Sequence, residues 1–436
     1  MAARPSVDII TQLGVETTPG TEVDATKALT SLNVEFSPEL EMQYARAQGK
    51  RLMTTGTKNK AWGTGSFSGI ASYIELALLL EGLLGRTAAV ENPVSGVATA
   101  YRRLFDSNLS ANQKTFTAER GDLTAAMVAT NLQFSTLEMQ FTRDGVNNSG
   151  NLFCREPNVS SNLTLRSEVQ TLMITGTPTG GTFTLSFDGQ TTAAIAYNAN
   201  AAAVQSALEA LSNIAVNEAV CTGGPLPGTP VVITFALTLA NTNQPLITAT
   251  SSLTGGSSPA ISIAQTTQGG YLSSFAEAPI SGNEVCVYMD SSAAALGTTL
   301  LTDAYDVSFS IPEVLSPKWV LNCTLSSFKE SVKRAIENTT VKITSEFNAQ
   351  TRVLYTALKA NSLPVYFVRI ECTGPQISGA VNNLARFDFA VKLDSGVKDI
   401  GDQDGTYAFE MPLRVVEDAT WGKGFEFTSI NTLASI

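Results

Sequence analysis

Two segments of this 436-residue chain repeat the same order of strand, helix and hairpin signals. Each segment has a strand of alternating apolar and polar residues that ends in Pro-Glu, at 32–39 in the first and at 305–313 in the second. A further strand then leads into a helix pattern, and a hairpin with glycine-containing turns closes the segment. In the second segment this hairpin is expected to pair 387–393 with 407–413. The repetition predicts two copies of one β-sandwich or barrel domain, each with a packed helix.

Residues 165–270 lie between the two copies and differ from them in composition. They contain one basic residue, Arg166, and are rich in Gly, Thr, Ala and Pro. Short alternating runs predict strands, and the spacing of apolar residues predicts a helix over 202–211. We therefore expect a mainly β (α+β) chain. Its domains are expected at 1–164 and 271–436, with a small strand-rich insert, immunoglobulin-like or α+β, at 165–270.

The helix pattern of the first copy, at 73–84, is apolar on nearly every side. Such a helix must be covered over most of its surface, and its own sheet can cover only one face. We therefore expect Tyr73, Leu76 and Leu80 to contact another subunit. An internal core helix is the alternative.

Residues 40–62 form a basic segment within an acidic chain. The segment lies between two predicted strands and lacks a strong apolar period, so it is expected to project as a long hairpin loop. Its only acidic residue is Glu41. A basic arm of this kind can dock on an acidic surface of a neighbouring copy, and a solvated loop is the alternative. The candidate contact residues are Arg46, Lys50, Arg51, Lys58 and Lys60.

Composition argues against most classes of enzyme. The chain has no histidine, which excludes histidine-based triads and histidine-ligated metals. Five scattered cysteines without a C-x-x-C pair indicate buried thiols rather than a disulfide framework or a thiolate metal site. The carboxylates show no cluster that would serve as a glycosidase acid pair. We expect no catalytic residue, no cofactor and no metal.

Charge and hydropathy bear on the partners. With 28 basic and 39 acidic residues the net charge is −11, which is a poor match for a phosphate backbone. The N-terminal residues lack a signal-peptide pattern, and the longest apolar run is too short for a membrane helix. The protein is therefore expected to be made in the cytoplasm, with no membrane segment.

Several motifs resemble those of the major tail tube proteins of long non-contractile-tailed bacteriophages (siphophages). They occur in both flanking segments and not in the insert. The motifs are GVETTPGT at 14–21, SPE at 37–39, ASYIELALLLEGLLG at 71–85, RDG at 143–145, LFCREP at 152–157, VCVYMD at 285–290 and LGTT at 296–299.

The resemblance implies a structural virion protein that forms stacked rings and thereby the conduit for genome delivery. Six tail tube domains normally complete a ring, so a chain with two of them would close as a homotrimer with pseudo-sixfold symmetry. Ring closure would remove the free edges of the sheets. In the family, the long hairpin loop, which corresponds to 40–62 here, bridges to the adjacent ring.

The resemblance also implies partners and a location. The tube would surround a tape-measure protein, meet tail terminator and tail-tip proteins, and pass double-stranded DNA without binding it specifically. A lumen of net negative charge would suit that passage. The protein would be assembled in the host cytoplasm and reside in the virion tail, with the insert decorating its outer surface. A surface adhesin or carbohydrate-binding β-module protein is the alternative function.

Overall fold

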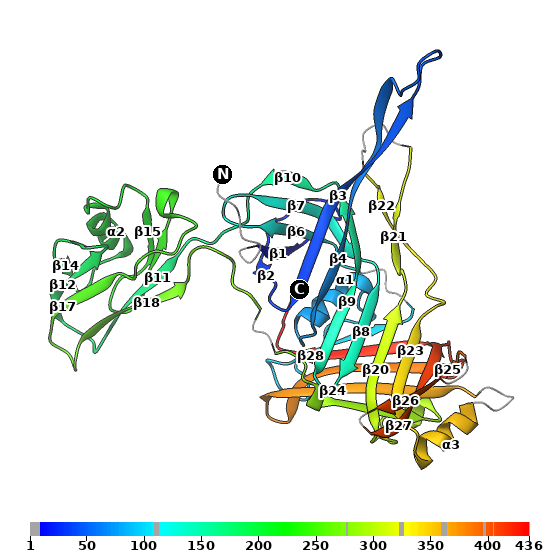
Figure 1. Ribbon diagram of the computed structural model, residues 1–436. Helices are drawn as coiled ribbons and strands as arrows, with labels where there is room; N and C mark the ends of the chain where they lie inside the picture. The colour runs from blue at the N-terminus through cyan, green and yellow to red at the C-terminus, as the bar shows by residue number, and fades with distance from the viewer. Residues whose placement is uncertain are drawn as a thin grey trace. The chain divides into compact units, whose positions relative to one another are not determined.

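The structure, a computed structural model, describes residues 9–108, 113–275, 278–321, 327–358, 364–395, 398–403 and 405–435. It is mainly β, which confirms the predicted fold class (Figure 1). The chain divides into two compact units. The large unit contains Met1–Leu163 and Ser274–Ile436, and the small unit contains Thr164–Ser273. We refer to residues 9–163 as the first half of the large unit and to residues 274–435 as its second half.

One antiparallel sheet, here called the shared sheet, crosses both halves of the large unit. Four of its strands come from each half, and the halves join where β8 pairs with β20. In order across the sheet, the strands are β3 (Leu32–Ala45), β4 (Thr55–Ile70), β9 (Gly145–Arg155), β8 (Leu137–Thr142), β20 (Ala304–Ile311), β23 (Thr340–Glu346), β27 (Thr406–Val415) and β26 (Lys398–Gln403).

A second layer of strands covers the apolar face of the shared sheet. Rings from the two layers meet in the core: Phe67 lies 5.1 Å from Phe134, and Phe309 lies 5.1 Å from Phe387. In the first half this layer consists of β2 (Lys27–Ala28), β1 (Ile10–Val15), β6 (Phe116–Gly121), β7 (Ala126–Phe134) and β10 (Asn158–Ser161). Over the second half it consists of β19 (Val285–Asp290), β24 (Tyr366–Ser378), β25 (Val381–Leu393) and β28 (Phe425–Asn431), and β5 (Tyr101–Asp106) of the first half pairs with β28 at its edge.

The two halves follow one plan in space. Each contributes to the shared sheet a first strand, a second strand and then a hairpin whose later strand lies inside. In each half a helix follows the second strand, α1 (Glu75–Leu83) in the first and α3 (Ala349–Leu358) in the second. The common strand order supports the proposal that the halves are copies of one domain, although both belong to one compact unit.

The hairpin predicted for the second copy has a different partner strand. β26 pairs with the first part of β27, from Thr406 to Glu410, and β25 meets β27 only at its end, from Val391↔Val415 to Leu393↔Leu413. β25 instead lies in the second layer, between β24 and β28. Two consecutive strands, β25 and β26, precede β27, and a glycine turn lies near both of them. The sequence pattern does not specify which of the two forms the hairpin with β27, so the prediction failed.

A buried carboxylate fixes the glycine-threonine turn of the first half. Glu16 directly follows β1 and accepts hydrogen bonds from the backbone N–H groups of Gly20 (2.6 Å) and Asn131 (2.7 Å). The hydroxyl groups of Thr115 (2.8 Å) and Thr117 (3.1 Å) also donate to it. Four donors offset the cost of burying the charge, so this part of the 14–21 motif has a structural role.

Asp290 has the same role in the second half. It ends β19 and accepts hydrogen bonds from the backbone N–H groups of Gly297 (2.9 Å) and Thr299 (3.0 Å) and from the hydroxyl of Thr298 (2.8 Å). Burial alone would raise the pKa of Asp290, but these hydrogen bonds outweigh it and hold the pKa below its ordinary value. Glu16 and Asp290 therefore mark equivalent positions in the two halves.

The small unit has a core of its own. Phe187 and Phe235 stack in it with ring centroids 5.2 Å apart, and a helix at Ala201–Glu209 (α2) confirms the predicted helix. The two ends of the unit meet in a pair of backbone hydrogen bonds between Arg166 and Gly270. Its strands are β11 (Val169–Thr175), β12 (Gly180–Phe187), β13 (Gln190–Thr191), β14 (Ile195–Ala196), β15 (Ala219–Gly223), β16 (Val231–Phe235), β17 (Thr248–Thr254) and β18 (Ala260–Thr267).

We predict that Glu16→Ala lowers the free energy of unfolding of the large unit by about 3 kcal/mol, because four buried donors lose their acceptor. Urea denaturation followed by tryptophan fluorescence measures this unit alone, since Trp62, Trp319 and Trp421 all lie in it. The control is Glu22→Ala on the same turn, where the carboxylate is exposed and the change should be within about 0.5 kcal/mol. Equal losses in both variants would contradict the role given to Glu16.

Candidate assembly surfaces

The shared sheet has a free edge at each end. Among the strands of the described residues, β3 pairs only with β4, and β26 pairs only with β27. Inside the chain, the strand equivalent to β26 is β8 and the strand equivalent to β3 is β20, and these two pair from Val307↔Phe141 to Ile311↔Leu137. The chain thus contains one completed junction between halves, and it presents the two edges from which a second could form.

The solvent-facing side of the shared sheet carries mainly short, uncharged polar side chains. This face is opposite the core, because buried and exposed residues alternate along its strands. One row of hydrogen-bonded neighbours crosses five strands in register. The row consists of Ser68, Ser149, Glu138, Ser310 and Thr340.

Cations on this face are held by carboxylates. Lys342 and Lys398 both lie 3.3 Å from Glu410, and Arg414 lies 2.5 Å from Asp394. Partial burial would raise the pKa of Glu410, but hydrogen bonds from the two lysines outweigh it and lower the pKa. Paired cations of this kind offer little to a phosphate backbone.

Residues 40–62 form a two-stranded ribbon instead of the predicted loop. β3 and β4 remain paired as far as Ala45↔Thr55, so only residues 46–54 form the connection. The ribbon projects from the large unit as the dark blue hairpin of Figure 1. A second, shorter ribbon, β21 (Leu315–Lys318) with β22 (Glu330–Lys333), occupies the corresponding place in the second half.

The structure places the five predicted cations in two groups on this ribbon. Arg46, Lys50 and Arg51 lie at the exposed tip, and none of the three has an ion pair within the described residues; the Arg46 guanidinium donates to the carbonyl of Lys50 (2.7 Å). Lys58 and Lys60 lie on β4 and are paired within the chain.

The carboxylate partners of the second group lie close by. Lys58 lies 2.6 Å from Glu156, and Lys60 lies 2.8 Å from Glu41. Hydrogen bonds from Lys60 and Asn59 lower the pKa of Glu41. Lys58 thus pairs with a carboxylate outside the ribbon and Lys60 pairs with one on the opposite strand of the ribbon, so the three tip cations are the ones available to a partner.

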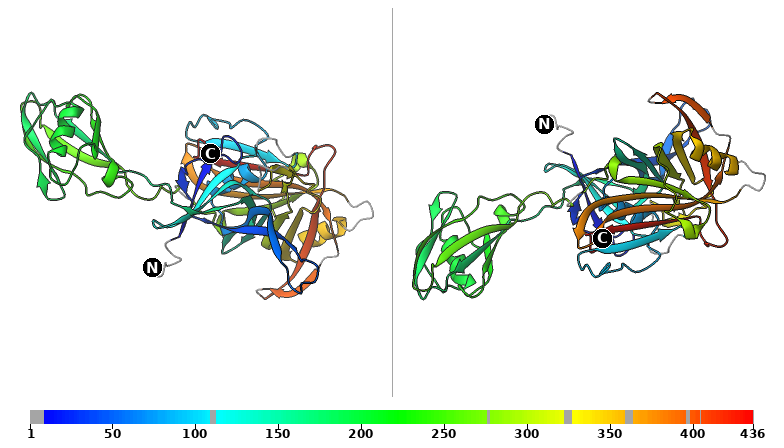
Figure 2. Two further views of the ribbon diagram at one scale, coloured as in Figure 1. Left: turned by 90° about the horizontal axis from the view of Figure 1, so that it is seen from above. Right: turned by 90° about the horizontal axis from the view of Figure 1, so that it is seen from below.

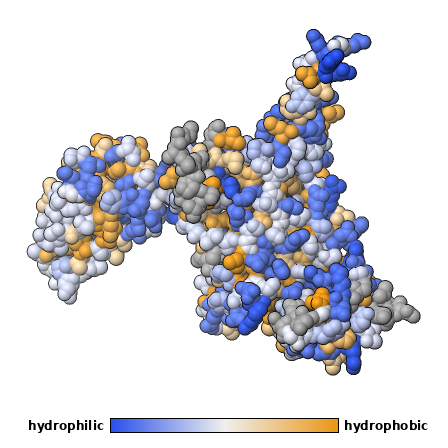
Figure 3. Space-filling model, viewed as in Figure 1, coloured by the Kyte–Doolittle hydropathy of each residue, from blue (hydrophilic) through white to orange (hydrophobic). Residues whose placement is uncertain are grey.

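Exposed apolar side chains also line the ribbon, and the sequence analysis missed them. Leu40, Met42 and Tyr44 alternate along β3, and Leu52 and Met53 follow at the tip. Figure 3 shows apolar patches along this ribbon below a hydrophilic end. The period of two along 40–44 was the available signal. Apolar residues exposed beside unpaired cations are typical of a protein-binding surface.

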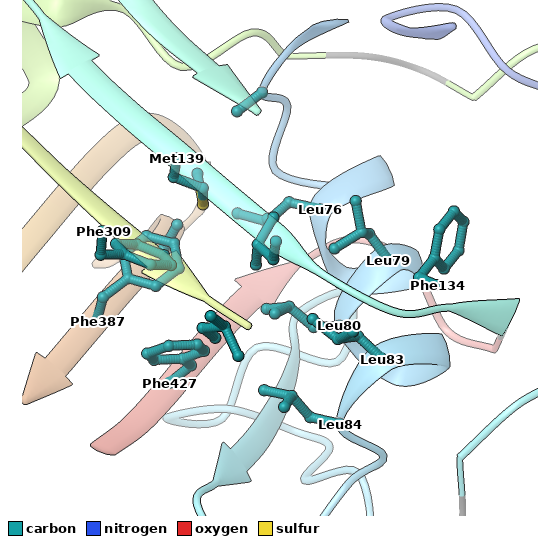
Figure 4. Packing of buried hydrophobic residues seen from close by; sticks show 14 of the residues in the cluster. Leu76, Leu79, Leu80, Leu83, Leu84, Phe134, Met139, Phe309, Phe387 and Phe427 are labelled. Atoms are coloured by element: carbon teal, nitrogen blue, oxygen red, sulfur yellow. The ribbon is translucent and has the colours of Figure 1, made fainter. Parts of the chain in front are cut away.

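The predicted subunit contact of Tyr73, Leu76 and Leu80 is wrong. Each of the three side chains is only 1% exposed within the single chain, so none can reach another subunit. Figure 4 shows Leu76 and Leu80 on the side of α1 that faces Phe309 and the other second-half phenylalanines. The apolar helix is covered, as its pattern required, but the second half of the same chain covers it.

The cysteines differ in their burial. Cys154, Cys221 and Cys372 are buried and Cys286 is exposed, while Cys323 lies outside the described residues. Burial raises the pKa of Cys154 and of Cys221 to about 12, so these two thiols stay protonated and unreactive.

No helix within the described ranges is long and apolar enough to cross a membrane.

Comparison with known proteins yields one partial similarity. No protein-family model matches the chain. Over 95 residues, 22% of the chain, it is 40% identical to a protein named tail sheath protein from Mycobacterium phage Bxz1. The matched region spans 15% of the length of that relative. The similarity supports a structural role in a phage tail at this coarse level, without distinguishing a tube protein from a sheath protein.

Proposed function

We propose that this chain is a structural protein of a phage tail that closes into rings, which stack to form the tail tube. The observation that carries the proposal is the β8–β20 junction, together with the free edges of β3 and β26. Because the halves share one plan, pairing β26 of one chain with β3 of the next would repeat the internal junction. A closed series of such junctions leaves no free sheet edge.

The register of the internal junction can be carried over to the proposed one. Since Ser310 lies opposite Glu138, the equivalent residues Ser37 and Lys398 would lie opposite each other. Lys398 would then be diagonal to Glu35 and Glu39, which extend from the same face of β3. Opposite charges at such cross-strand positions favour pairing.

Three chains with two copies each would give a pseudo-sixfold ring. The solvent-facing side of the shared sheet would then line the lumen, around a tape-measure protein. Its mainly uncharged polar side chains and paired cations suit the passage of double-stranded DNA, because a channel with unpaired lysines and arginines would retain the phosphates. Tail terminator and tail-tip proteins would meet the two ends of the tube. The role is structural rather than catalytic, and the finished protein would reside in the virion tail.

Negative-stain electron microscopy of the purified full chain tests the proposal. We expect stacked rings whose averaged end-on views show three peripheral densities, one for each small unit. Six equal densities would contradict a ring with two copies per chain. A chain that polymerises only around a separately supplied tube would indicate a sheath, and isolated monomers at high concentration would contradict assembly altogether.

We predict that reversing the charge of the ribbon tip, with Arg46→Glu, Lys50→Glu and Arg51→Glu, weakens ring stacking more than ring closure. These cations are exposed and lack carboxylate partners within the described residues, so they are available to an adjacent ring. The readout is the ratio of tubes to single rings in micrographs. The control keeps every charge, with Arg46→Lys, Lys50→Arg and Arg51→Lys. Equal loss of rings and stacks would refute the assignment.

We predict that removing most of the small unit, residues 167–269, leaves tube assembly intact. Arg166 and Gly270 already meet through two backbone hydrogen bonds, so a short glycine-serine linker can join the cut ends without strain. The two units have separate cores. Tubes are counted by electron microscopy, with tryptophan fluorescence as a check that the large unit is folded. A folded, soluble truncation that forms no tubes would show that the small unit is needed for assembly.

A further inference from the structure

The helices α1 and α3 begin in the same way, which sets their residues in register. The side chain of Ser72 accepts the backbone N–H of Glu75, and the side chain of Asn348 accepts that of Thr351. The carbonyls of Ser72 and Asn348 accept the backbone N–H groups of Leu76 and Arg352, each at 3.1 Å. Ser72 and Asn348 are therefore equivalent, and every later residue of α1 has a counterpart in α3.

One face of α1 is covered by the second half, and the same face of α3 is bare. On α1 this face consists of Tyr73, Leu76, Ala77 and Leu80, which follow helical spacing and are all buried. In α3 all four equivalent residues are exposed, and Val353 has 67% of its surface accessible. The α3 face, as we call it, consists of Ala349, Arg352, Val353 and Thr356.

The opposite side of α3 is already packed, so the bare face is not a consequence of a loosely held helix. Thr351 is 1% exposed, and its hydroxyl donates to the carbonyl of Glu346 (2.7 Å). The ring of Tyr355, one turn later, lies 6.5 Å from that of Phe409. Val353 lies between these two inward residues in sequence and on the opposite side of the helix.

Tyr73 shows what covers the equivalent face of α1. Its hydroxyl donates to Glu284 (3.0 Å), and its carbonyl accepts from the side-chain amide of Asn431 (2.8 Å). Its ring lies so close to Gly374 that a Cβ there would come within 2.4 Å of it. Glu284 directly precedes β19, Asn431 ends β28, and Gly374 lies in β24 just beyond its last residue paired with β19, Cys372. The equivalent positions in the first half should therefore form the surface that would cover the α3 face.

The corresponding place in the first half is an open hollow. Thr11 lies as many residues before Glu16 as Val285 lies before Asp290, so Thr11 and Val285 are equivalent. The strand partner of Thr11 is Arg120 on β6, and the strand partner of Val285 is Cys372 on β24. The strand near Gly374 is thus equivalent to the end of β6. The hollow there is lined mostly by apolar residues: Ile9, Arg120, Gly121, Ala126, Met127 and Val159.

We propose that the α3 face of one chain docks in this hollow of a second copy of the chain. The contact repeats, between chains, the arrangement that buries α1 within the chain. α3 and the strands β1 and β10 lie at opposite ends of the large unit (Figures 1 and 2). The contact is therefore head-to-tail and propagates around a ring. This inference rests on the proposed ring and names a second contact at each of its junctions, beside the β26–β3 pairing.

Three valines allow a matched test. Val353→Glu alters the α3 face, Val159→Glu alters the hollow, and Val216→Glu is the control in the small unit. The side chains are 67%, 57% and 68% exposed, so all three variants should fold as the wild type does. We expect Val353→Glu and Val159→Glu each to raise the protein concentration needed for ring formation by about tenfold or more, since an unpaired carboxylate would be buried. Val216→Glu should have no effect. Sedimentation velocity measures the distribution of species.

Mixing the two assembly-defective variants adds a sharper criterion. An equimolar mixture retains one intact contact, between α3 of the Val159→Glu chain and the hollow of the Val353→Glu chain. The mixture should therefore form dimers that do not grow, while either variant alone stays monomeric at the same concentration. This outcome is specific to a heterologous contact between these two surfaces.

The failure of this inference is distinguishable from failure of the proposed function. A wild-type chain that forms no rings refutes the ring itself. Wild-type rings with unchanged assembly of Val353→Glu or of Val159→Glu overturn the contact and leave the ring standing. If Val159→Glu lowers the melting temperature of the monomer without changing assembly, the hollow is occupied by the chain's own residues, which also overturns the proposal.

Discussion

The pairing of β8 with β20 is the interaction on which the rest of the large unit depends. It joins strands from Leu137–Thr142 and Ala304–Ile311, which the whole small unit separates in sequence. By placing both halves in one sheet it brings the second half against α1. The nine residues of α1 are all buried, between strands of the first half on one side and the second half on the other, and one hydrophobic core runs through both halves. Without this junction α1 would expose a leucine-rich face to water.

Charge is distributed differently on the two surfaces that the proposed assembly uses. On the solvent-facing side of the shared sheet, Lys342 and Lys398 converge on Glu410, so one carboxylate offsets part of their charge. At the ribbon tip, Arg46 and Arg51 have no such carboxylate within the described residues. Salt screens exposed charges over about 10 Å, so the tip can attract a partner only at short range. One surface is therefore suited to passage and the other to attachment.

The strands and helices of this fold could be predicted from the sequence better than the pairing between strands. The alternating strands and the helices after them follow from local periodicity, as does the helix of the small unit. Pairing between distant strands has no local signal, so neither the β8–β20 junction nor the true partner of β27 could be derived. For the candidate assembly surface, the excess of basic residues in 40–62 identified the cations of the ribbon. The alternation of Leu40, Met42 and Tyr44 was visible but was outweighed by that charge.

The contrast between α1 and α3 explains why equivalent positions carry different side chains. Leu76 and Leu80 face a junction that forms as the chain folds and is never again exposed to water. Their counterparts Arg352 and Thr356 are exposed to water in the single chain, where the proposed contact with a second copy would cover them. Interfaces between separately folded proteins are accordingly less apolar than a core. If the two halves are copies of one domain, as we propose, the copy that contacts a second chain would keep its backbone plan and differ in the polarity of one helix face.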